Sequence, residues 1–135
     1  MVDIELIQKA ISLTQQGEIL EAEEIYNNIQ KENPDNPDIL SIIGLFYVNI
    51  ANYDKAIEIL NKAAKLKKTL GTTSALGFAY FEQRNFAKAA EYLEEALENG
   101  KNEDIYNKLV LSLFEIKNYK KAVEFADKMY ELYPE

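Results

Sequence analysis

Apolar residues recur at intervals of three and four residues along the chain, which is the spacing of one face of an α-helix. The clearest stretch, residues 70–100, holds two such runs separated by a short polar break. In the second run Ala89, Leu93 and Ala96 follow an i, i+4, i+7 pattern, and Gly77 in the first run leaves room for a close helix. The stretch therefore predicts a helical hairpin that is too short to bury its own apolar surface.

Four such hairpins follow one another along the sequence. Ala89 has counterparts at Ala22, Ala56 and Ala122, so the pattern repeats every 33 or 34 residues. Units of this kind stack on their neighbours to form one continuous core. We predict a single all-α array over residues 1–135, with repeats at roughly 3–36, 37–69, 70–102 and 103–135.

Short polar turns separate the two helices of each predicted hairpin. Three of the turns contain an asparagine (Asn52, Asn85 and Asn118), and the first contains Gly17. Both residue types tolerate the left-handed backbone conformation, and asparagine also caps helices. We expect them to serve one or both purposes here. Between hairpins, Pro34 is a stop signal and Asn36 is a start signal.

The composition narrows the class of protein. Fifteen Lys and Arg residues against 23 Asp and Glu residues give a net charge of −8, which disfavours nucleic acid and anionic membranes as partners. The sequence has no Cys, which excludes disulfides, and no His, the commonest general base and metal ligand.

No motif of an enzyme is present. The glycines form no phosphate-binding loop, the serines have no His to activate them, and the carboxylates lie opposite the apolar stripe of predicted helices, where solvent is the expected environment. We predict no catalytic residue, no cofactor and no metal site, and we expect that the protein is not an enzyme.

The N-terminus carries Asp3 and Glu5 where a secretory signal needs positive charge, so we predict no signal peptide. The most apolar run, residues 39–51, is too short for a transmembrane helix and predicts a buried core helix. A cytoplasmic location is expected.

The repeat resembles the tetratricopeptide repeat, a helix–turn–helix unit of about 34 residues. Its Leu-Gly-x-x-Tyr element corresponds to Ile43-Gly44 with Tyr47, and to Leu76-Gly77 with Tyr80. Its small residue corresponds to the four alanines, and its closing proline to Pro34 and Pro134. The family's early Trp is replaced by Leu6, Leu40, Thr73 and Tyr106. The resemblance implies a right-handed superhelical solenoid of about eight helices in antiparallel pairs, with a concave peptide-binding groove lined by the first helices.

The first helices carry a second apolar set beside their core face, and a helix that is apolar on two faces needs two partners. We predict that this set lines the concave groove, although packing between adjacent repeats is the alternative. The predicted groove residues are Ile7, Ile11, Ser41, Leu45, Val48, Asn49, Ser74, Phe78, Phe81, Asn107, Leu111 and Phe114. Phe78 and Phe81 are expected to be central.

Some tetratricopeptide proteins bind acidic chaperone tails through a clamp of basic and amide side chains. The corresponding residues here are Ile7, Ile11, Ile42, Gly71 and Ala75, none of which has a side-chain donor. We therefore predict no co-chaperone binding of that kind.

The sequence favours a protein–protein interaction scaffold that binds an apolar or amphipathic peptide. One alternative is self-association through an uncapped last helix bearing Phe125, Met129 and Tyr133. Another is a regulatory arm of a larger bacterial enzyme, because the first half of the chain is similar to repeat arrays that precede glycosyl- or sulfo-transferase domains.

Overall fold

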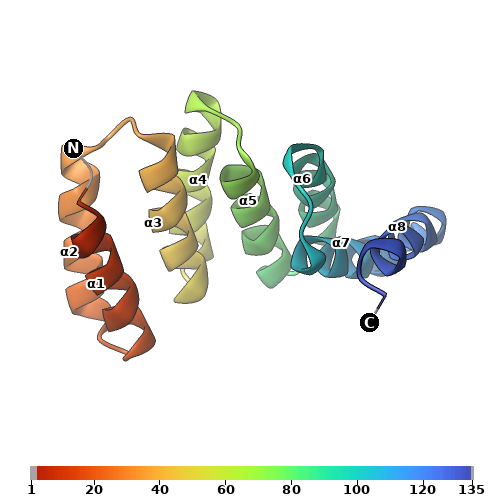
Figure 1. Ribbon diagram of the computed structural model, residues 1–135, viewed down its shortest axis with the longest axis horizontal. Helices are drawn as coiled ribbons and strands as arrows, with labels where there is room; N and C mark the ends of the chain where they lie inside the picture. Colours follow the sequence, from red (N-terminus) through yellow and green to blue (C-terminus); the bar gives the residue numbers. More distant parts are fainter. Residues whose placement is uncertain (1–2, 135) are drawn as a thin grey trace.

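The computed structural model describes residues 3–134, and within them every regular element is an α-helix (Figure 1). The eight helices form four pairs. Their bounds are α1 Ile4–Gln15, α2 Ile19–Glu32, α3 Pro37–Asn49, α4 Tyr53–Leu66, α5 Leu70–Glu82, α6 Phe86–Asn99, α7 Glu103–Glu115 and α8 Tyr119–Leu132.

The helix pairs stack in chain order, so that α1 and α2 form one end of the molecule and α8 the other (Figure 1). Each helix contacts the next one in sequence. The first helices of neighbouring pairs also contact one another, α3 with α5 and α5 with α7, which places them on the inner side of the array. This arrangement confirms the predicted all-α solenoid of helical hairpins.

Helix starts follow the expected capping chemistry. The side chain of Asn36 accepts hydrogen bonds from the backbone N–H groups of Asp38 and Ile39 at 3.0 and 3.2 Å, with Pro37 as the first helical residue. Asn102 caps α7 in the same way. Most helix starts are therefore set locally, by side chains that satisfy backbone groups left free at a helix terminus, whereas Glu18 at the start of α2 forms no such bond.

In three of the turns the left-handed conformation and the helix cap fall on two different residues, whereas we expected asparagine to serve for one or both. The left-handed conformation falls on the residue before each asparagine, with φ values of 63°, 64° and 65° at Ala51, Arg84 and Lys117. Asn52, Asn85 and Asn118 instead have negative φ values and cap the next helix. In the first turn Gly17 takes the left-handed position, as predicted.

The core of each hairpin depends on small residues. The four repeat alanines are buried, three of them completely. The side chain of Leu60 packs directly on the backbone of Gly44, and that of Leu93 packs on Gly77. A glycine at these two places lets the paired helices approach, because a β-carbon there would overlap the leucine. No helix in residues 3–134 is long and apolar enough to cross a membrane.

Candidate binding groove

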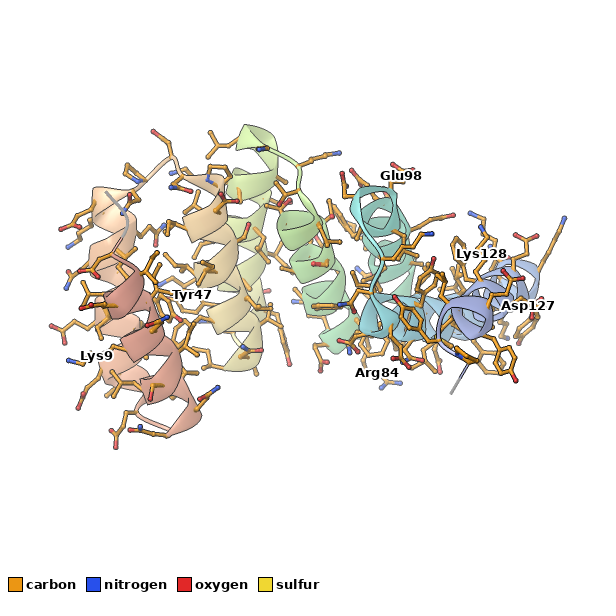
Figure 2. All side chains as sticks on the ribbon, in the orientation of Figure 1. Lys9, Tyr47, Arg84, Glu98, Asp127 and Lys128 are labelled. Atoms are coloured by element: carbon orange, nitrogen blue, oxygen red, sulfur yellow. The ribbon has the colours of Figure 1, made fainter. Side chains whose placement is uncertain are left out.

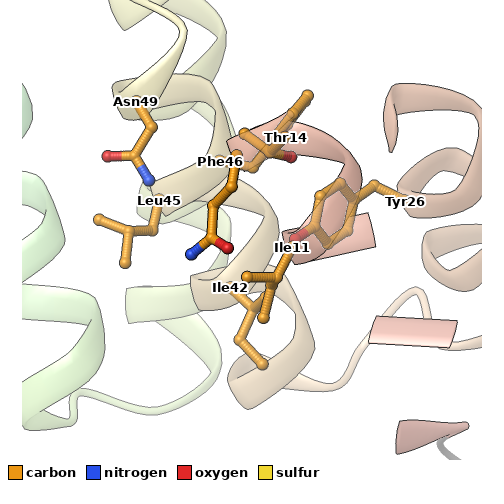
Figure 3. Close-up of a pocket in the computed structure, with 8 residues that line it drawn as sticks. Ile11, Thr14, Tyr26, Ile42, Leu45, Phe46 and Asn49 are labelled. Atoms are coloured by element: carbon orange, nitrogen blue, oxygen red, sulfur yellow. The ribbon is translucent and has the colours of Figure 1, made fainter. Parts of the chain in front are cut away.

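An apolar opening lies between α1 and α3 (Figure 3). It has a volume of about 280 Å³ and is mostly apolar, with polar side chains at its edge. Three helices line it. The residues are Ile11, Thr14 and Gln15 from α1, Tyr26 from α2, and Ile42, Leu45, Phe46 and Asn49 from α3.

A second pocket of about 170 Å³ lies between α3 and α5. It shares Ile42 and Leu45 with the first pocket, so these two side chains form a common wall. Its other lining residues are Ser41, Gly71, Ser74, Ala75 and Phe78. The two pockets together form an apolar surface that crosses the first three hairpins.

An aromatic pair explains why the first pocket is the larger. Tyr26 of α2 and Phe46 of α3 pack with their ring centroids 4.7 Å apart at the first junction. The corresponding residues at the next junction are Leu60 and Ala79, which are much smaller. The bulkier pair holds the first hairpin away from the second and leaves space between α1 and α3.

Six of the twelve predicted groove residues line the two pockets. Ile11, Leu45 and Asn49 are in the first pocket, and Ser41, Ser74 and Phe78 join Leu45 in the second. Three more predicted residues, Asn107, Leu111 and Phe114, lie exposed on α7 outside both pockets.

Two predicted groove residues lie in the core instead. Ile7 and Val48 are each only 8% exposed and belong to the buried cluster. Their prediction as open lining residues was wrong, because neighbouring helices cover the side of the helix on which they lie. Ile42, which we had considered only as a clamp position, takes a place in both pockets.

Phe78 and Phe81 are half-buried and have a cationic neighbour. The Nζ atom of Lys108 lies 5.2 Å from the ring centroid of Phe78 and 5.7 Å from that of Phe81. Lys108 also forms an ion pair with Asp104 at 2.8 Å. Phe81 packs edge-on against Phe86 of α6, so it serves hairpin packing and lines neither pocket.

Sequence reasoning missed Tyr26 and Phe46 as lining residues because both follow the core pattern. The available signal was their size: the other repeats have smaller side chains at both positions. Burial raises the pKa of the Tyr26 phenol above its usual value, so this residue presents a neutral ring to the pocket.

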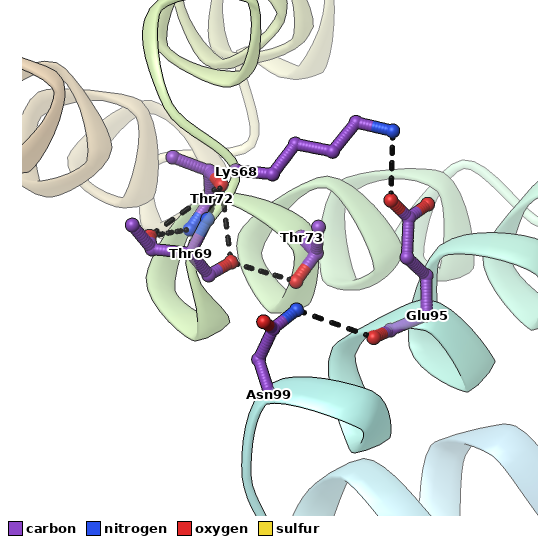
Figure 4. Close-up of polar contacts among 6 residues, drawn as sticks. All are labelled: Lys68, Thr69, Thr72, Thr73, Glu95 and Asn99. Carbon is purple, nitrogen blue, oxygen red and sulfur yellow. Dashed lines mark hydrogen bonds and ion pairs between the residues drawn. The ribbon is translucent and has the colours of Figure 1, made fainter.

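The buried hydroxyl groups offer no chemistry of their own. Figure 4 shows the polar cluster at the start of α5, where Thr69 and Thr72 cap the helix reciprocally and Thr73 donates to the Thr69 carbonyl at 2.8 Å. Beside it Lys68 pairs with Glu95 at 2.8 Å, and this carboxylate raises the pKa of the lysine. Residues 3–134 contain no buried side-chain polar atom without a partner and no group of three or more potential metal ligands.

Known structures with a similar fold include "Crystal structure of MamA" and "Crystal structure of MamA protein". The first is 26% identical, with a TM-score of 0.83, and the match covers 99% of this chain and 77% of that one. The second is 25% identical, with the same TM-score, and covers 96% and 72%. One chain of "Structure of Naa15/Naa10 bound to HypK-THB" shares the fold at 19% identity and a TM-score of 0.80, over 96% of this chain and 20% of that one.

A search of curated protein sequences found no match. Two sequence models described as Tetratricopeptide repeat match residues 13–69 and 74–135. Repeats of this type and the solenoid fold support a role as a protein–protein interaction scaffold, and such scaffolds are typically not enzymes. The chain belongs to the tetratricopeptide repeat family.

Proposed function

We propose that the two pockets bind an apolar or amphipathic segment of another protein. The observation that carries this proposal is the wall formed by Ile42 and Leu45, which joins the pockets into one surface. Leu45 remains 40% exposed there. A partner with apolar side chains at a regular spacing would bury this surface, and the burial would stabilise the complex.

The dimensions of the pockets favour side chains over free small molecules. Pockets for drug-sized ligands have volumes of about 300–1,000 Å³ and enclose most of the ligand. The volumes here, about 280 and 170 Å³, fall below that range. Each pocket suits one or two apolar side chains of a peptide.

The polar edge of the first pocket is suited to the backbone of the same peptide. Gln15 and Asn49 lie exposed there, and neither side chain forms a hydrogen bond to another residue in the described part of the chain. An amide side chain both donates and accepts, so each one can pair with a peptide group. Thr14 contributes less, because its hydroxyl already donates to the Ala10 carbonyl at 2.8 Å.

The charge of the groove argues for an uncharged or weakly basic segment. The lining residues of both pockets carry no formal charge, and the chain as a whole carries −8. An acidic peptide would find neither a basic clamp nor a favourable field. We keep the prediction that the chain catalyses no reaction.

Leu45→Glu tests the proposal, because it charges the shared wall at an exposed position. Peptides selected from a random library on the wild-type protein should bind this variant at least about ten-fold more weakly, the loss typical of a central interface residue. Leu20→Glu is the matched control, since Leu20 is 82% exposed on α2. Equal binding of the selected peptides to Leu45→Glu and wild type would refute the groove.

A further inference from the structure

The last helix exposes an apolar stripe. Tyr119, Val123, Ala126 and Tyr130 follow the i, i+4, i+7, i+11 spacing of one helix face. Tyr119, Val123 and Tyr130 are 51%, 59% and 69% exposed. We call these four residues the α8 stripe.

The α8 stripe corresponds to a surface that is covered elsewhere in the array. The residues of α6 at the same positions are Phe86, Ala90, Leu93 and Leu97. In α6 all four are buried or half-buried, and α7 packs on that helix. Two of these positions pack within their own hairpin: Phe86 and Leu93 contact Phe81 and Gly77 of α5, and Tyr119 packs in the same way on Phe114, with ring centroids 5.3 Å apart. The other two positions are Val123 and Tyr130 in α8, and no helix covers them among the described residues.

The residues that we had predicted for self-association point elsewhere. Phe125 and Tyr133 lie against Tyr106 of α7, with ring centroids 6.5 and 6.3 Å away, and Met129 is half-buried. These three side chains largely serve the contact within the last hairpin. Tyr119, Val123 and Tyr130 of the α8 stripe are more exposed than these three residues.

The opposite end of the array is polar. Helix α3 carries three buried apolar residues along one face, Ile39, Ile43 and Phe46, and Phe46 packs on Tyr26 of the preceding hairpin. The same positions in α1 are the exposed residues Glu5, Lys9 and Ser12, and Lys9 is seen at this end in Figure 2. Head-to-tail stacking of two copies would bury a carboxylate and an ammonium against the apolar α8 stripe, which is costly. The two ends do not match each other.

We propose that the α8 stripe pairs with the α8 stripe of a second copy in an antiparallel, two-fold symmetric dimer. The stripe is symmetric about its own centre between residues 124 and 125. Antiparallel pairing about that centre places Tyr119 opposite Tyr130 of the second copy, and Val123 opposite Ala126. Large residues then meet at the two ends and small ones in the middle, where the helices come closest.

The charges beside the stripe fit the same register. Lys120 and Asp127 lie on one flank of α8, and neither forms an ion pair with another residue between positions 3 and 134. At a rise of about 1.5 Å per residue, Lys120 of one copy lies within about 3 Å along the axis of Asp127 of the other. Two opposite-charge pairs therefore form by symmetry. Figure 2 shows Asp127 on the outer part of α8.

The dimer should be weak. One face of a 14-residue helix is smaller than the roughly 800 Å² per partner of a standard interface. Each copy also carries a net charge of −8, which opposes association at low ionic strength. Added salt screens this repulsion and should strengthen the dimer.

Sedimentation velocity over about 10 µM to 1 mM, the range in which weak association is populated, tests the proposal. We expect a monomer–dimer equilibrium for the wild-type chain. Val123→Glu and Tyr130→Glu should each weaken it at least about ten-fold. Leu20→Glu, the same change at an exposed leucine of α2, should leave it unchanged. Circular dichroism verifies that every variant is folded.

Charge reversal tests the register. Lys120→Asp and Asp127→Lys should each weaken the dimer, and the double variant should restore it, because the opposite-charge pairs are then re-formed with exchanged partners. A chain that stays monomeric at every concentration, or a dimer that survives Tyr130→Glu, would overturn the proposed surface. Failure of the double variant to recover would overturn the antiparallel register.

Discussion

The hydroxyl of Tyr47 donates a hydrogen bond to a carboxylate oxygen of Glu23 at 2.9 Å. This bond joins α3 to α2 across the first junction, beside the aromatic pair that opens the larger pocket. The Tyr47 ring is completely buried, and the Nζ atom of Lys55 lies 4.8 Å from its centroid. The contact therefore links the first hairpin to the second.

Tyr47→Phe removes the hydroxyl and leaves the ring in place. We expect the free energy of unfolding to fall by about 1–3 kcal/mol, the range for a hydrogen bond to a charged acceptor. Urea denaturation followed by circular dichroism measures the change. Tyr130→Phe is the control, since Tyr130 is 69% exposed and donates no hydrogen bond within residues 3–134. An equal loss in both variants would contradict the role of the Glu23 bond.

Stability should fall in alkali. Burial, and then the hydrogen bond to Glu23, raises the pKa of Tyr47, so the folded protein holds this proton more tightly than the unfolded chain does. The unfolded chain ionises first as the pH passes about 10, and the free energy of unfolding then decreases by up to about 1.4 kcal/mol per pH unit for each such group. Burial also raises the pKa of Tyr26 and Tyr92. The free energy of unfolding of Tyr47→Phe should decline less steeply than that of the wild type above pH 10. Below about pH 9 the two slopes should be the same.

Gly77→Ala should destabilise the third hairpin. A β-carbon at this position would overlap the side chain of Leu93. Overpacking costs about 1–3 kcal/mol, and the better helix propensity of alanine offsets about 1 kcal/mol of it. Gly71→Ala, in the same helix, has no atom nearer than 3.5 Å and should be neutral or slightly stabilising. Thermal denaturation compares the two, and a more stable Gly77→Ala variant would show that the hairpin relaxes freely.

Ala51→Gly should stabilise the protein. Ala51 has a φ of 63°, in the left-handed region where a β-carbon costs about 1–2 kcal/mol. Glycine also raises the conformational entropy of the unfolded chain, which offsets part of this stabilisation. We therefore expect the free energy of unfolding to increase by about 0.5–1 kcal/mol. Gly17→Ala makes the reverse change at a φ of 84° and should lower stability. Chemical denaturation measures the free energy of unfolding of both variants. A change in the same direction for both would be inconsistent with this explanation.

Phe78→Glu should weaken the binding of groove peptides with a modest loss of stability. Phe78 is half-buried, and the new carboxylate would face the ammonium group of Lys108. Fluorescence anisotropy with a selected peptide should show a loss of at least about ten-fold. Phe114→Glu is a matched change on α7, at a residue 58% exposed and outside both pockets, and should bind normally. Comparable losses for both variants would place the binding site beyond the two pockets.

The sequence by itself determined the repeat, the helix pairs and the places where helices begin. Apolar spacing and capping side chains act over a few residues, so a pattern such as Asn36-Pro37 fixes a helix start without reference to the rest of the fold. The glycines and alanines at the hairpin contact were also predictable, because only small residues permit that approach.

The tertiary structure alone decided which side of each first helix stays open. Periodicity defines faces by angle, but it does not say how much of a face the neighbouring helices cover. For this reason Ile7 and Val48, which we predicted to line the groove, are buried in the core, while Ile42 lines the first pocket without having been predicted there. The larger pocket and the open stripe on α8 have the same origin, which is the way neighbouring helices pack. Tyr26 and Phe46 set the spacing of two hairpins by their volume, and Tyr130 is exposed because no helix of residues 3–134 stacks on it.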